Sequence, residues 1–592
     1  MPKLAVVRAA LLGVALTSTM GCRGRPRSWD VPIEGERPRD TGAVILEFDL
    51  GSGAPERSAG GFLSLPSHHT FDALVAALRS AEARKNVKGV FVAFDTAGIG
   101  WARAHEFGDG LKRIKDSGVP VLCHADAWDN TAYAIAVRGC STIAMSPAGE
   151  VEVTGPSATT PYARELLEDR LHAQVDMLQI GKFKGAAEPL TRDGPSDEFR
   201  TSIERALKAI TRSYREALDE RGVGALLGTG PYMGGEALDN KLVDELVDRK
   251  AAREEIKKKG NAVIDVVYGP GTAGQKPGLA DILRAISQND GEASNKPHVE
   301  LVRLSGEIAL DGGGGLFGGG GIVARKVVEQ ARKLANNDSV RAVVLRIDSP
   351  GGSALGSDLA WIAVKELRDK KPVIVSIGEM AASGGYYIAC AGTRIFAEPE
   401  SIVGSIGVVG GKISFEGTLA MVGVHTASFG DKRAAMLGSI TEPWDDPTRT
   451  RVRAAMTKIY ELFLERVSEG RGEPQSTFEN AVEGRVFGGE QAKELKLVDD
   501  IGGLADAIAA AKKAANLPDT APVVTDEAGG LFSGLAGGDE LHALFPLAGA
   551  TIAGELVDAE ELSALRSWAL AFLRATRGGS VAAMLPAPLL VR

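Results

Sequence analysis

The segment SVRAVVLRIDSPGGS, residues 339–353, carries the pattern that decides the fold. Its run of apolar and β-branched residues predicts a buried strand that ends near Ile347, and the Ser-Pro-Gly-Gly sequence after it predicts a turn. A segment of the same pattern, NVKGVFVAFDTAGIG, lies earlier in the chain, at residues 86–100. Three further pairs recur in the same order: GVPVLCHAD (118–126) with KKPVIVSIGE (370–379), YAIAVRG (133–139) with YYIACAG (386–392), and MGGEALDNKLVDEL (233–246) with FGGEQAKELKLVDDI (487–501). The chain is therefore a tandem duplication of one large repeat.

In each repeat, short β-branched runs alternate with amphipathic stretches of helical periodicity. The predicted strands are VILEFDL (44–50), VKGVFVAF (87–94) and VPVLCHA (119–125), and then HVELVRL (298–304), VRAVVLRI (340–347) and KPVIVSI (371–377). The predicted helices include residues 70–84, 197–222, 321–336 and 448–472. Near-continuous apolar strands separated by helices are typical of parallel βαβ units with helices over the sheet. The sequence therefore predicts an α/β fold built as a tandem duplication, with helical extensions.

The composition shifts along the chain predict six segments. These are a signal segment (1–22), a polar, Pro-rich linker (23–41), the first repeat (42–260), a second linker (261–297), the second repeat (298–515) and a C-terminal extension (516–592). The extension has no partner in the duplication, so its role stays open.

The composition is that of a soluble globular protein, with 44% hydrophobic and 24% charged residues among 592. A net charge of −9 gives no basic surface for nucleic acid, so we expect no nucleic-acid partner. No CxxC or Cys/His spacing indicates a metal site. The cysteines Cys123, Cys140 and Cys390 lie in apolar surroundings, and we interpret them as small buried hydrophobic residues.

The N-terminal segment MPKLAVVRAALLGVALTSTMGC has two basic residues, then a short apolar run, then small residues before Cys22. This order is typical of an export signal, and the apolar run is short for a membrane-spanning helix. The ending TMGC resembles a bacterial lipobox, in which the cysteine is lipidated, although Thr19 stands where leucine is usual. We expect an exported, membrane-tethered protein, with a single uncleaved transmembrane anchor as the alternative.

Ser383 lies in GEMAASGGYYIACAG (378–392), among the smallest residues and between a predicted strand and a predicted helix. One interpretation is a structural N-cap for the helix. The other is a nucleophile around which small residues leave room for a substrate backbone. The first repeat has Asn130 at the corresponding position and lacks the glycine pair, so only one repeat retains this serine.

Gly351 and Gly352 follow the strand that ends near Ile347. Glycines at the carboxyl end of a parallel strand expose backbone N–H groups where open α/β folds bind ligands. Such donors can stabilise the oxyanion of an acyl-transfer reaction, although an ordinary glycine turn explains the pattern equally well. The first repeat lacks the paired glycines.

A nucleophilic serine requires a base, and no histidine motif supplies one; His425 is interpreted as structural. A buried lysine can act as a base because burial disfavours its charged form. Lys184, in QIGKFKGAAEPLTRD (179–193), is the candidate, and Lys182 would face the other way on an extended segment. The alternative is a solvent-facing loop lysine. If Gly430 matches Gly181, then Arg433 takes the corresponding place in the second repeat, and arginine cannot serve as a base.

The motifs DSPGGS, MAASGGYYIA, GSIGVVGG, GKFKGAAEPL and GGEQAKELKLVDDIGG occur in the order seen in one protein family. Over residues 42–515 the chain resembles the long, tandem-domain form of the bacterial signal peptide peptidase A family, serine–lysine proteases of the Clp protease/crotonase superfold. The resemblance implies Ser383 as nucleophile, Lys184 as general base and Ser405 as the residue that orients the lysine. It also implies an oxyanion hole made by Gly384 and by Gly351 or Gly352. Phe183 and Gly185 depart from the family's usual tyrosine and serine.

The resemblance implies an envelope endopeptidase that needs no metal or cofactor and degrades remnant signal peptides. It also implies a ring-like homo-oligomer, tetrameric in the long form. Two alternatives stay open: an enzyme of the same superfold that acts on acyl-CoA thioesters, and a non-catalytic envelope scaffold. The glycine-rich segment at 311–321 lacks the Gly-Lys-Ser/Thr ending of a phosphate-binding loop, so we interpret it as a plain loop.

Overall fold

The computed structural model describes residues 42–51, 53–56, 69–95, 98–269, 296–311 and 321–525, together with the backbone at 582–584 and 590–591. The predicted signal segment, Cys22 and most of the glycine-rich segment at 311–321 lie outside the described residues. Among the residues described, no helix combines the length and the apolar character needed to cross a bilayer.

The first repeat forms a parallel sheet with the order β10-β1-β2-β3-β4-β9. Its strands are β1 (Val44–Asp49), β2 (Val87–Phe94), β3 (Val121–Ala125), β4 (Thr142–Met145), β9 (Glu245–Leu246) and β10 (Val263–Tyr268). The helices around it are α2 (Phe71–Ala83), α3 (Trp101–Asp116), α4 (Asn130–Gly139), α6 (Asp197–Arg221) and α8 (Arg249–Gly260). Strand β2 is buried over nearly its whole length, as a continuous apolar run between two helical layers requires.

The second repeat repeats this architecture in the parallel path β22-β11-β14-β16-β17-β21. At its other end, β16 also pairs in parallel with β18, which pairs antiparallel with β20. Its strands are β11 (His298–Ser305), β14 (Val340–Ser349), β16 (Val373–Ala382), β17 (Arg394–Ala397), β18 (Ile402–Gly404), β20 (Val486–Phe487), β21 (Asp500–Ile501) and β22 (Val523–Thr525). The helices include α10 (Ala324–Ala335), α11 (Ala354–Arg368), α12 (Gly384–Ala389), α15 (Asp446–Arg471) and α17 (Leu504–Ala514). All the strands predicted from sequence are present, which agrees with the predicted tandem α/β fold.

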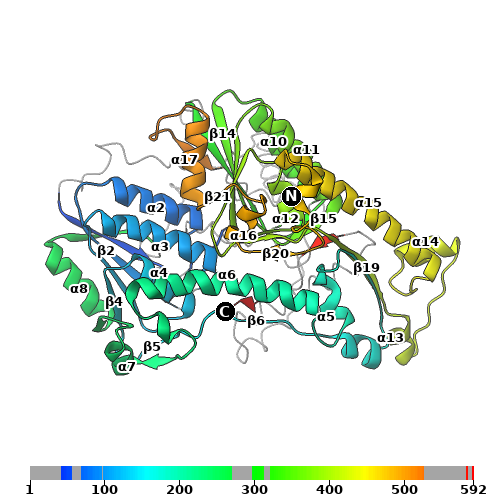
Figure 1. Cartoon of the computed structure of the whole chain (residues 1–592), viewed down its shortest axis with the longest axis horizontal. Coiled ribbons are helices and arrows are strands. Elements are labelled where there is room, and N and C mark those ends of the chain that lie inside the picture. Colours follow the sequence, from blue (N-terminus) through cyan, green and yellow to red (C-terminus); the bar gives the residue numbers. More distant parts are fainter. Residues whose placement is uncertain are drawn as a thin grey trace, which may run out of the picture.

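A third sheet joins the two repeats. Strand β7 (Gln174–Ile180) of the first repeat crosses over and pairs antiparallel with β19 (Val408–Ser414) of the second. The same sheet contains β12 (Ile308–Ala309), β13 (Ile322–Val323), β15 (Gly351–Ser353) and β23 (Ala582–Met584). Figure 1 shows the first repeat, coloured from blue through cyan to green, beside the second, coloured from green through yellow to orange, with long helices α6 and α15 running along the molecule.

Both predicted repeats, 42–260 and 298–515, end too early in the sequence. Strand β10 lies inside the predicted linker 261–297 but pairs in parallel with β1, and β22 lies beyond residue 515 but pairs with β11. Both strands form the same edge of their repeat's sheet. Both strands fell outside the predicted repeats because the last matched segments, 233–246 and 487–501, end before them.

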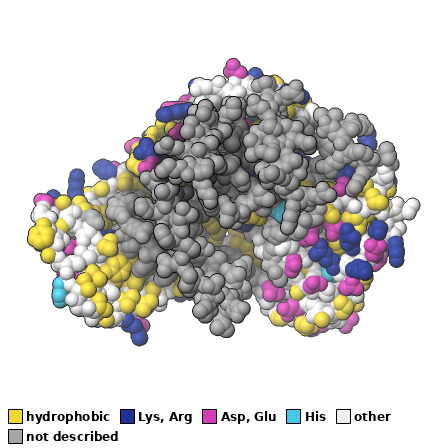
Figure 2. Space-filling model, turned by 180° about the vertical axis from the view of Figure 1, so that it is seen from behind, with side chains coloured by type: hydrophobic (Ala, Val, Ile, Leu, Met, Phe, Trp, Pro, Cys, Tyr) yellow, Lys and Arg dark blue, Asp and Glu magenta, His cyan; other side chains and the backbone are white. Residues whose placement is uncertain are grey.

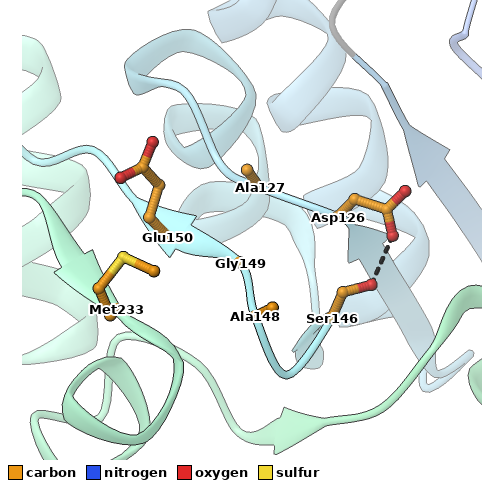
Figure 3. Close-up of a pocket in the computed structure, with 7 residues that line it drawn as sticks. All are labelled: Asp126, Ala127, Ser146, Ala148, Gly149, Glu150 and Met233. Atoms are coloured by element: carbon orange, nitrogen blue, oxygen red, sulfur yellow. Dashed lines mark hydrogen bonds between the residues drawn. The ribbon is translucent and has the colours of Figure 1, made fainter.

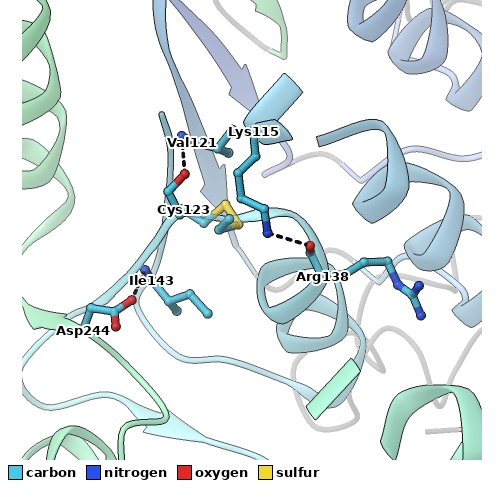
Figure 4. The surroundings of a disulfide bond; sticks show 8 residues. Lys115, Val121, Cys123, Arg138, Ile143 and Asp244 are labelled. Carbon is cyan, nitrogen blue, oxygen red and sulfur yellow. Dashed lines mark hydrogen bonds between the residues drawn. A yellow bond between two sulfur atoms is a disulfide. The ribbon is translucent and has the colours of Figure 1, made fainter. Parts of the chain in front are cut away.

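The interpretation of Cys123 and Cys140 as unlinked hydrophobic residues was wrong, because they form a disulfide (Figure 4). Cys123 lies on β3 and Cys140 directly follows α4, and the two Cα atoms are 6.0 Å apart. Within one βα unit the end of a helix returns beside the strand that precedes it, and this packing brings the pair together. Cys390 is buried and free, as predicted.

Candidate active site

Ser383 lies at the junction of β16 and α12, in a backbone conformation that serine rarely adopts. Its φ is +53° and its side chain is fully buried. A serine at positive φ is strained, and such strain is typical of residues that a fold holds in place for function. Its amide donates to the carbonyl oxygen of Gly404, 2.8 Å away. Ser383 is the N-cap residue of α12, but its side chain makes no capping hydrogen bond, so its hydroxyl does not serve as the cap.

Lys184 reaches Ser383 because of the strand that crosses between the repeats. The β7–β19 register pairs Ile180 with Val408, so the segment after β7 runs past the residues just before β19. The Nζ atom of Lys184 lies 2.7 Å from Oγ of Ser383, and the lysine is only 1% exposed. The crossover therefore places an amine from one repeat beside a hydroxyl from the other.

Ser405 provides the remaining partners of the lysine. Nζ of Lys184 lies 2.8 Å from the carbonyl oxygen of Ser405 and 2.9 Å from its Oγ. Ser405 has a φ of +54°, and its amide donates to the carbonyl oxygen of Arg485. The two hydrogens of a neutral amine can be donated to the two Ser405 oxygens, which leaves the lone pair for the Ser383 hydroxyl.

The surroundings of Lys184 favour the neutral amine. Burial lowers the pKa of Lys184 well below 10.5. Within the described part of the chain, the hydrogen-bond partners of its Nζ are oxygens of Ser383 and Ser405, and no carboxylate among them favours the charged form. An uncharged amine within hydrogen-bond distance of a serine hydroxyl has the geometry of a base and a nucleophile.

Two glycines make room for the lysine, and sequence analysis did not find either. A Cβ atom on Gly407 would lie 3.2 Å from Cδ of Lys184, and one on Gly484 would lie 2.6 Å from its amide nitrogen. Gly484 also has a φ of +85°. Gly407 lies within the GSIGVVGG motif and Gly484 lies shortly before FGGEQAKELKLVDDI (487–501), but only the packing of the two repeats shows what these glycines contact.

The candidate oxyanion donors lie together. A Cβ on Gly384 would lie 3.2 Å from the amide nitrogen of Gly352, so the two amides are neighbours. Gly352 also needs to be glycine because its φ is +151° and a Cβ would lie 2.2 Å from the carbonyl oxygen of Ile308. The amide of Gly351 donates to Oγ of Ser349, 3.2 Å away. Gly352 is therefore the better candidate of the two.

The other candidates lie elsewhere. Lys182 is exposed, as expected from its place on the other side of the segment, and both Arg433 and His425 are exposed. Asn130, which corresponds to Ser383, is held by Glu152 and Thr154 through its amide nitrogen, and its oxygen accepts from the amide of Gly155. Asn130 therefore has a structural role.

The first repeat has a surface depression at the carboxyl ends of β3 and β4 (Figure 3). Its hydroxyl, on Ser146, donates to Asp126, and the nearby Glu150 side chain points away from that pair. Neither a lysine nor a histidine is among its lining residues. This depression therefore does not reproduce the Ser383–Lys184 arrangement.

Comparison with known proteins agrees with this geometry. The family model described as "Peptidase family S49" matches residues 113–263 and 365–518, together more than half of the chain. "Protease 4" of Haemophilus influenzae is 29% identical over 462 residues, which cover 76% of this chain and 73% of that protein. "Serine protease SPPA, chloroplastic" of Arabidopsis thaliana is 27% identical over 447 residues, covering 73% of this chain and 64% of that protein. A shorter relative from Enterococcus faecium is 32% identical over 233 residues, covering 38% of this chain and 66% of its own length.

The fold and these matches define a serine peptidase of the Clp protease/crotonase type. Both halves of the duplication take part in the match. The chain belongs to peptidase family S49.

Proposed function

We propose that the protein is an endopeptidase that uses a Ser383–Lys184 dyad. The lone pair of neutral Lys184 takes the hydroxyl proton as Oγ of Ser383 attacks a peptide carbonyl carbon. The amides of Gly384 and Gly352 stabilise the resulting oxyanion. The lysine then gives its proton to the leaving amine, the C–N bond breaks, and an ester with Ser383 remains. Water, deprotonated by Lys184, hydrolyses that ester and restores the serine hydroxyl.

The observation that carries this proposal is the 2.7 Å separation between Nζ of Lys184 and Oγ of Ser383, inside a site where the lysine is buried. Ser405 supports the same roles, because its two oxygens fix the direction in which the lysine lone pair points. Since the base must be neutral, activity should rise with pH through the depressed pKa of Lys184.

The test is intact-mass analysis after reaction with a fluorophosphonate, together with cleavage of a fluorogenic peptide. We expect the wild type to gain one adduct, and Ser383→Ala and Lys184→Ala each to lose both labelling and cleavage while keeping the wild-type circular dichroism spectrum. Lys182→Ala is the matched control, because Lys182 is exposed, and it should react normally. Near wild-type turnover by Lys184→Ala would contradict the dyad.

For the substrate, we propose extended apolar peptides, such as remnant signal peptides, bound by strand addition. The backbone of β23, from the end of the chain, pairs antiparallel with β15 beside the site, so a peptide strand can occupy this position. Gly351 and Gly352 on β15 present no side chain against such a strand. A peptide with an apolar core should be cleaved faster than one of equal length with alternating charges; equal rates would contradict this specificity.

We also propose that copies of the chain assemble, as the ring-like tetramer of the resemblance implies. If Gly430 matches Gly181, residues 423–429 are the second repeat's counterpart of β7. The first repeat's counterpart of β19 then lies near β6 (Ala158–Thr159). Residues 423–429 are exposed and form no strand, and Phe429 is 93% exposed. In the described chain, β6 pairs with β24 (Leu590–Val591) alone.

Within the chain, β7 pairs antiparallel with β19. By analogy, residues 423–429 can pair with the first repeat's counterpart of β19, near β6. In Figure 1, the end of the molecule with α13 (Glu416–Met421) and α14 (Lys432–Gly438) lies away from β6, so this pairing would join two copies. Figure 2, turned by 180°, shows hydrophobic side chains gathered on the same end, now at the left. A head-to-tail contact of this kind closes into a ring when the rotation permits.

Phe429→Asp should convert the oligomer to monomers in analytical ultracentrifugation. Leu355→Asp is the matched control, because Leu355 is also exposed (57%) but lies on α11. A wild type that stays monomeric at micromolar concentration, or an oligomer unaffected by Phe429→Asp, would contradict this interface.

Finally, we propose an envelope location, with the protein tethered to the membrane through lipidated Cys22. The Cys123–Cys140 disulfide supports export, because disulfides persist in oxidising compartments. Metabolic labelling with a fatty-acid analogue should mark the wild type and not Cys22→Ala. Equal labelling of both would contradict lipidation at Cys22, and a protein that keeps its full N-terminal segment and stays in the membrane would indicate the transmembrane anchor instead.

A further inference from the structure

The strand that leads to the nucleophile is bound to a helix of the other repeat. Glu379 lies on β16, four residues before Ser383. Its Oε2 accepts from the amide of Ala102, 3.2 Å away, and its Oε1 accepts from the amide of Arg103 at 3.1 Å and from Nε of Arg103 at 3.0 Å. These donors belong to the first turn of α3, in the first repeat.

Helix α3 has no N-terminal cap of its own. Its N-cap residue is Gly100, which has no side chain to accept a hydrogen bond, and its first turn contains no acidic residue. The first amides of a helix require acceptors, and a carboxylate there is also favoured by the helix dipole. Glu379 supplies both from the other repeat.

Gly100 is glycine because of this contact. Its φ is −66°, which any residue can adopt, but a Cβ there would lie 2.1 Å from Cδ of Glu379. Arg103 is fixed further by donating from Nη1 to the carbonyl oxygen of Ala54, 2.8 Å away. Although burial alone would lower the pKa of Arg103, the carboxylates of Glu379, Glu56 and Asp348 raise it. This contact between Glu379 and the first turn of α3, called the clamp below, is therefore an ion pair whose two side chains are mostly buried.

We propose that Glu379 is a positioning residue for the proposed dyad, which holds the Ser383 segment in register with the repeat that supplies Lys184. The inference rests on the dyad proposed above. Both ends of the clamp matter to catalysis, because Ser383 and Lys184 come from different repeats and must stay within hydrogen-bond distance. A displacement of about 1 Å at a reacting group can cost on the order of a hundredfold in rate.

The test compares Glu379→Gln with the wild type in peptide cleavage, fluorophosphonate labelling rate and thermal unfolding. The amide has one acceptor oxygen where the carboxylate uses two. We expect kcat and the labelling rate to fall together by at least roughly tenfold, with KM within about twofold. The apparent pKa in the pH–rate profile should not change, because Glu379 acts through position. Labelling within twofold of the wild type would overturn the inference.

Asp72→Asn is the matched control. Asp72 lies in the first turn of α2 and accepts from Arg303 of the second repeat at 3.0 Å, so it is another charged contact between the repeats. It does not adjoin the nucleophile strand. We expect Asp72→Asn to lower the unfolding temperature while the labelling rate stays within about twofold of the wild type. An equal loss of labelling rate in both variants would overturn the inference, since it would indicate general loosening.

Gly100→Ala tests the clamp from its other side. Its Cβ should displace the Glu379 carboxylate and reproduce the lower kcat, and the double variant should lose no more than either single variant. Additive losses would overturn the inference.

If Glu379→Gln does not fold, Glu379→Asp is used, because it keeps the charge but cannot reach both amides. Wild-type labelling by that variant would also overturn the inference. Absence of labelling in the wild type would instead contradict the proposed dyad.

Discussion

At the scale of single residues, the site depends on one residue with a strained backbone and one buried lysine. Ser383 has a positive φ, and Lys184 is buried without a carboxylate among its Nζ partners. The duplication identified both residues in the sequence, because each is absent from the other repeat. The choice between Gly351 and Gly352 could not be predicted, since it depends on the hydrogen bond from the Gly351 amide to Ser349.

Replacing the buried lysine should stabilise the protein. Because burial lowers the pKa of Lys184, the unfolded chain binds one more proton than the folded chain at any pH between that depressed value and about 10.4. In that interval the free energy of unfolding rises with pH, by about 1.4 kcal/mol per unit. Lys184→Met should lose this slope and be more stable than the wild type at pH 7, though inactive. Urea denaturation between pH 6 and 9 measures it.

Lys182→Met provides the control for this prediction, because Lys182 is exposed and should keep the wild-type slope and activity. If Lys184→Met retained the same dependence on pH, the lysine would not be neutral in the folded protein.

Ser405 should affect rate more than stability. Ser405→Ala and Ser405→Gly both remove the hydroxyl near Nζ of Lys184, and both should lower kcat by roughly 10- to 100-fold. The glycine variant should be the more stable of the two, because the φ of +54° strains a residue with a Cβ. Fluorophosphonate inactivation rates and thermal unfolding separate these effects. Unchanged kcat in both variants would exclude an orienting role.

At the scale of elements, the periodicity of the sequence was sufficient for most of the fold. The central strands are buried on both faces and therefore have continuous apolar runs, which is why β2 and β14 were predicted within two residues of their observed ends. The edge strands β10 and β22 were missed because they lie beyond the last matched segments of the duplication, 233–246 and 487–501. The disulfide was missed because it depends on how α4 packs against β3.

The disulfide should contribute measurably to stability. It closes a short loop, with a sequence separation of 17, for which the chain-entropy model gives about 3 kcal/mol. Replacing Cys123 and Cys140 with alanine should lower the free energy of unfolding by about that amount and leave kcat unchanged below the transition. Denaturation with and without reductant measures it. Cys390→Ala is the control, since the buried thiol of Cys390 is free and its variant should still respond to reductant. A wild type that is indifferent to reductant would contradict the prediction.

At the scale of the whole molecule, two similar repeats provide one candidate site. The position that corresponds to Ser383 is Asn130, whose amide is held by its neighbours. If Gly430 matches Gly181, Arg433 corresponds to Lys184. This asymmetry was predictable from the sequence alone. The crossover of β7 onto β19 was not, because pairing between repeats leaves no local pattern in either strand.

Titration should therefore find one reactive serine per chain. Excess fluorophosphonate should add one adduct per chain, and peptide mapping should place it in the segment that contains Ser383. Two adducts on the native wild-type chain would indicate a second working site in the first repeat.

The split dyad also bears on how such a chain arose. In a chain with a single repeat, the crossing strand would have to pair with a second copy. The serine of one copy would then meet the lysine of another, so catalysis would require two polypeptides to associate. In the fused chain the two side chains meet within one molecule, so formation of the pair should not depend on protein concentration. A chain with one such pair does not require a second serine, which is consistent with Asn130 at the position that corresponds to Ser383.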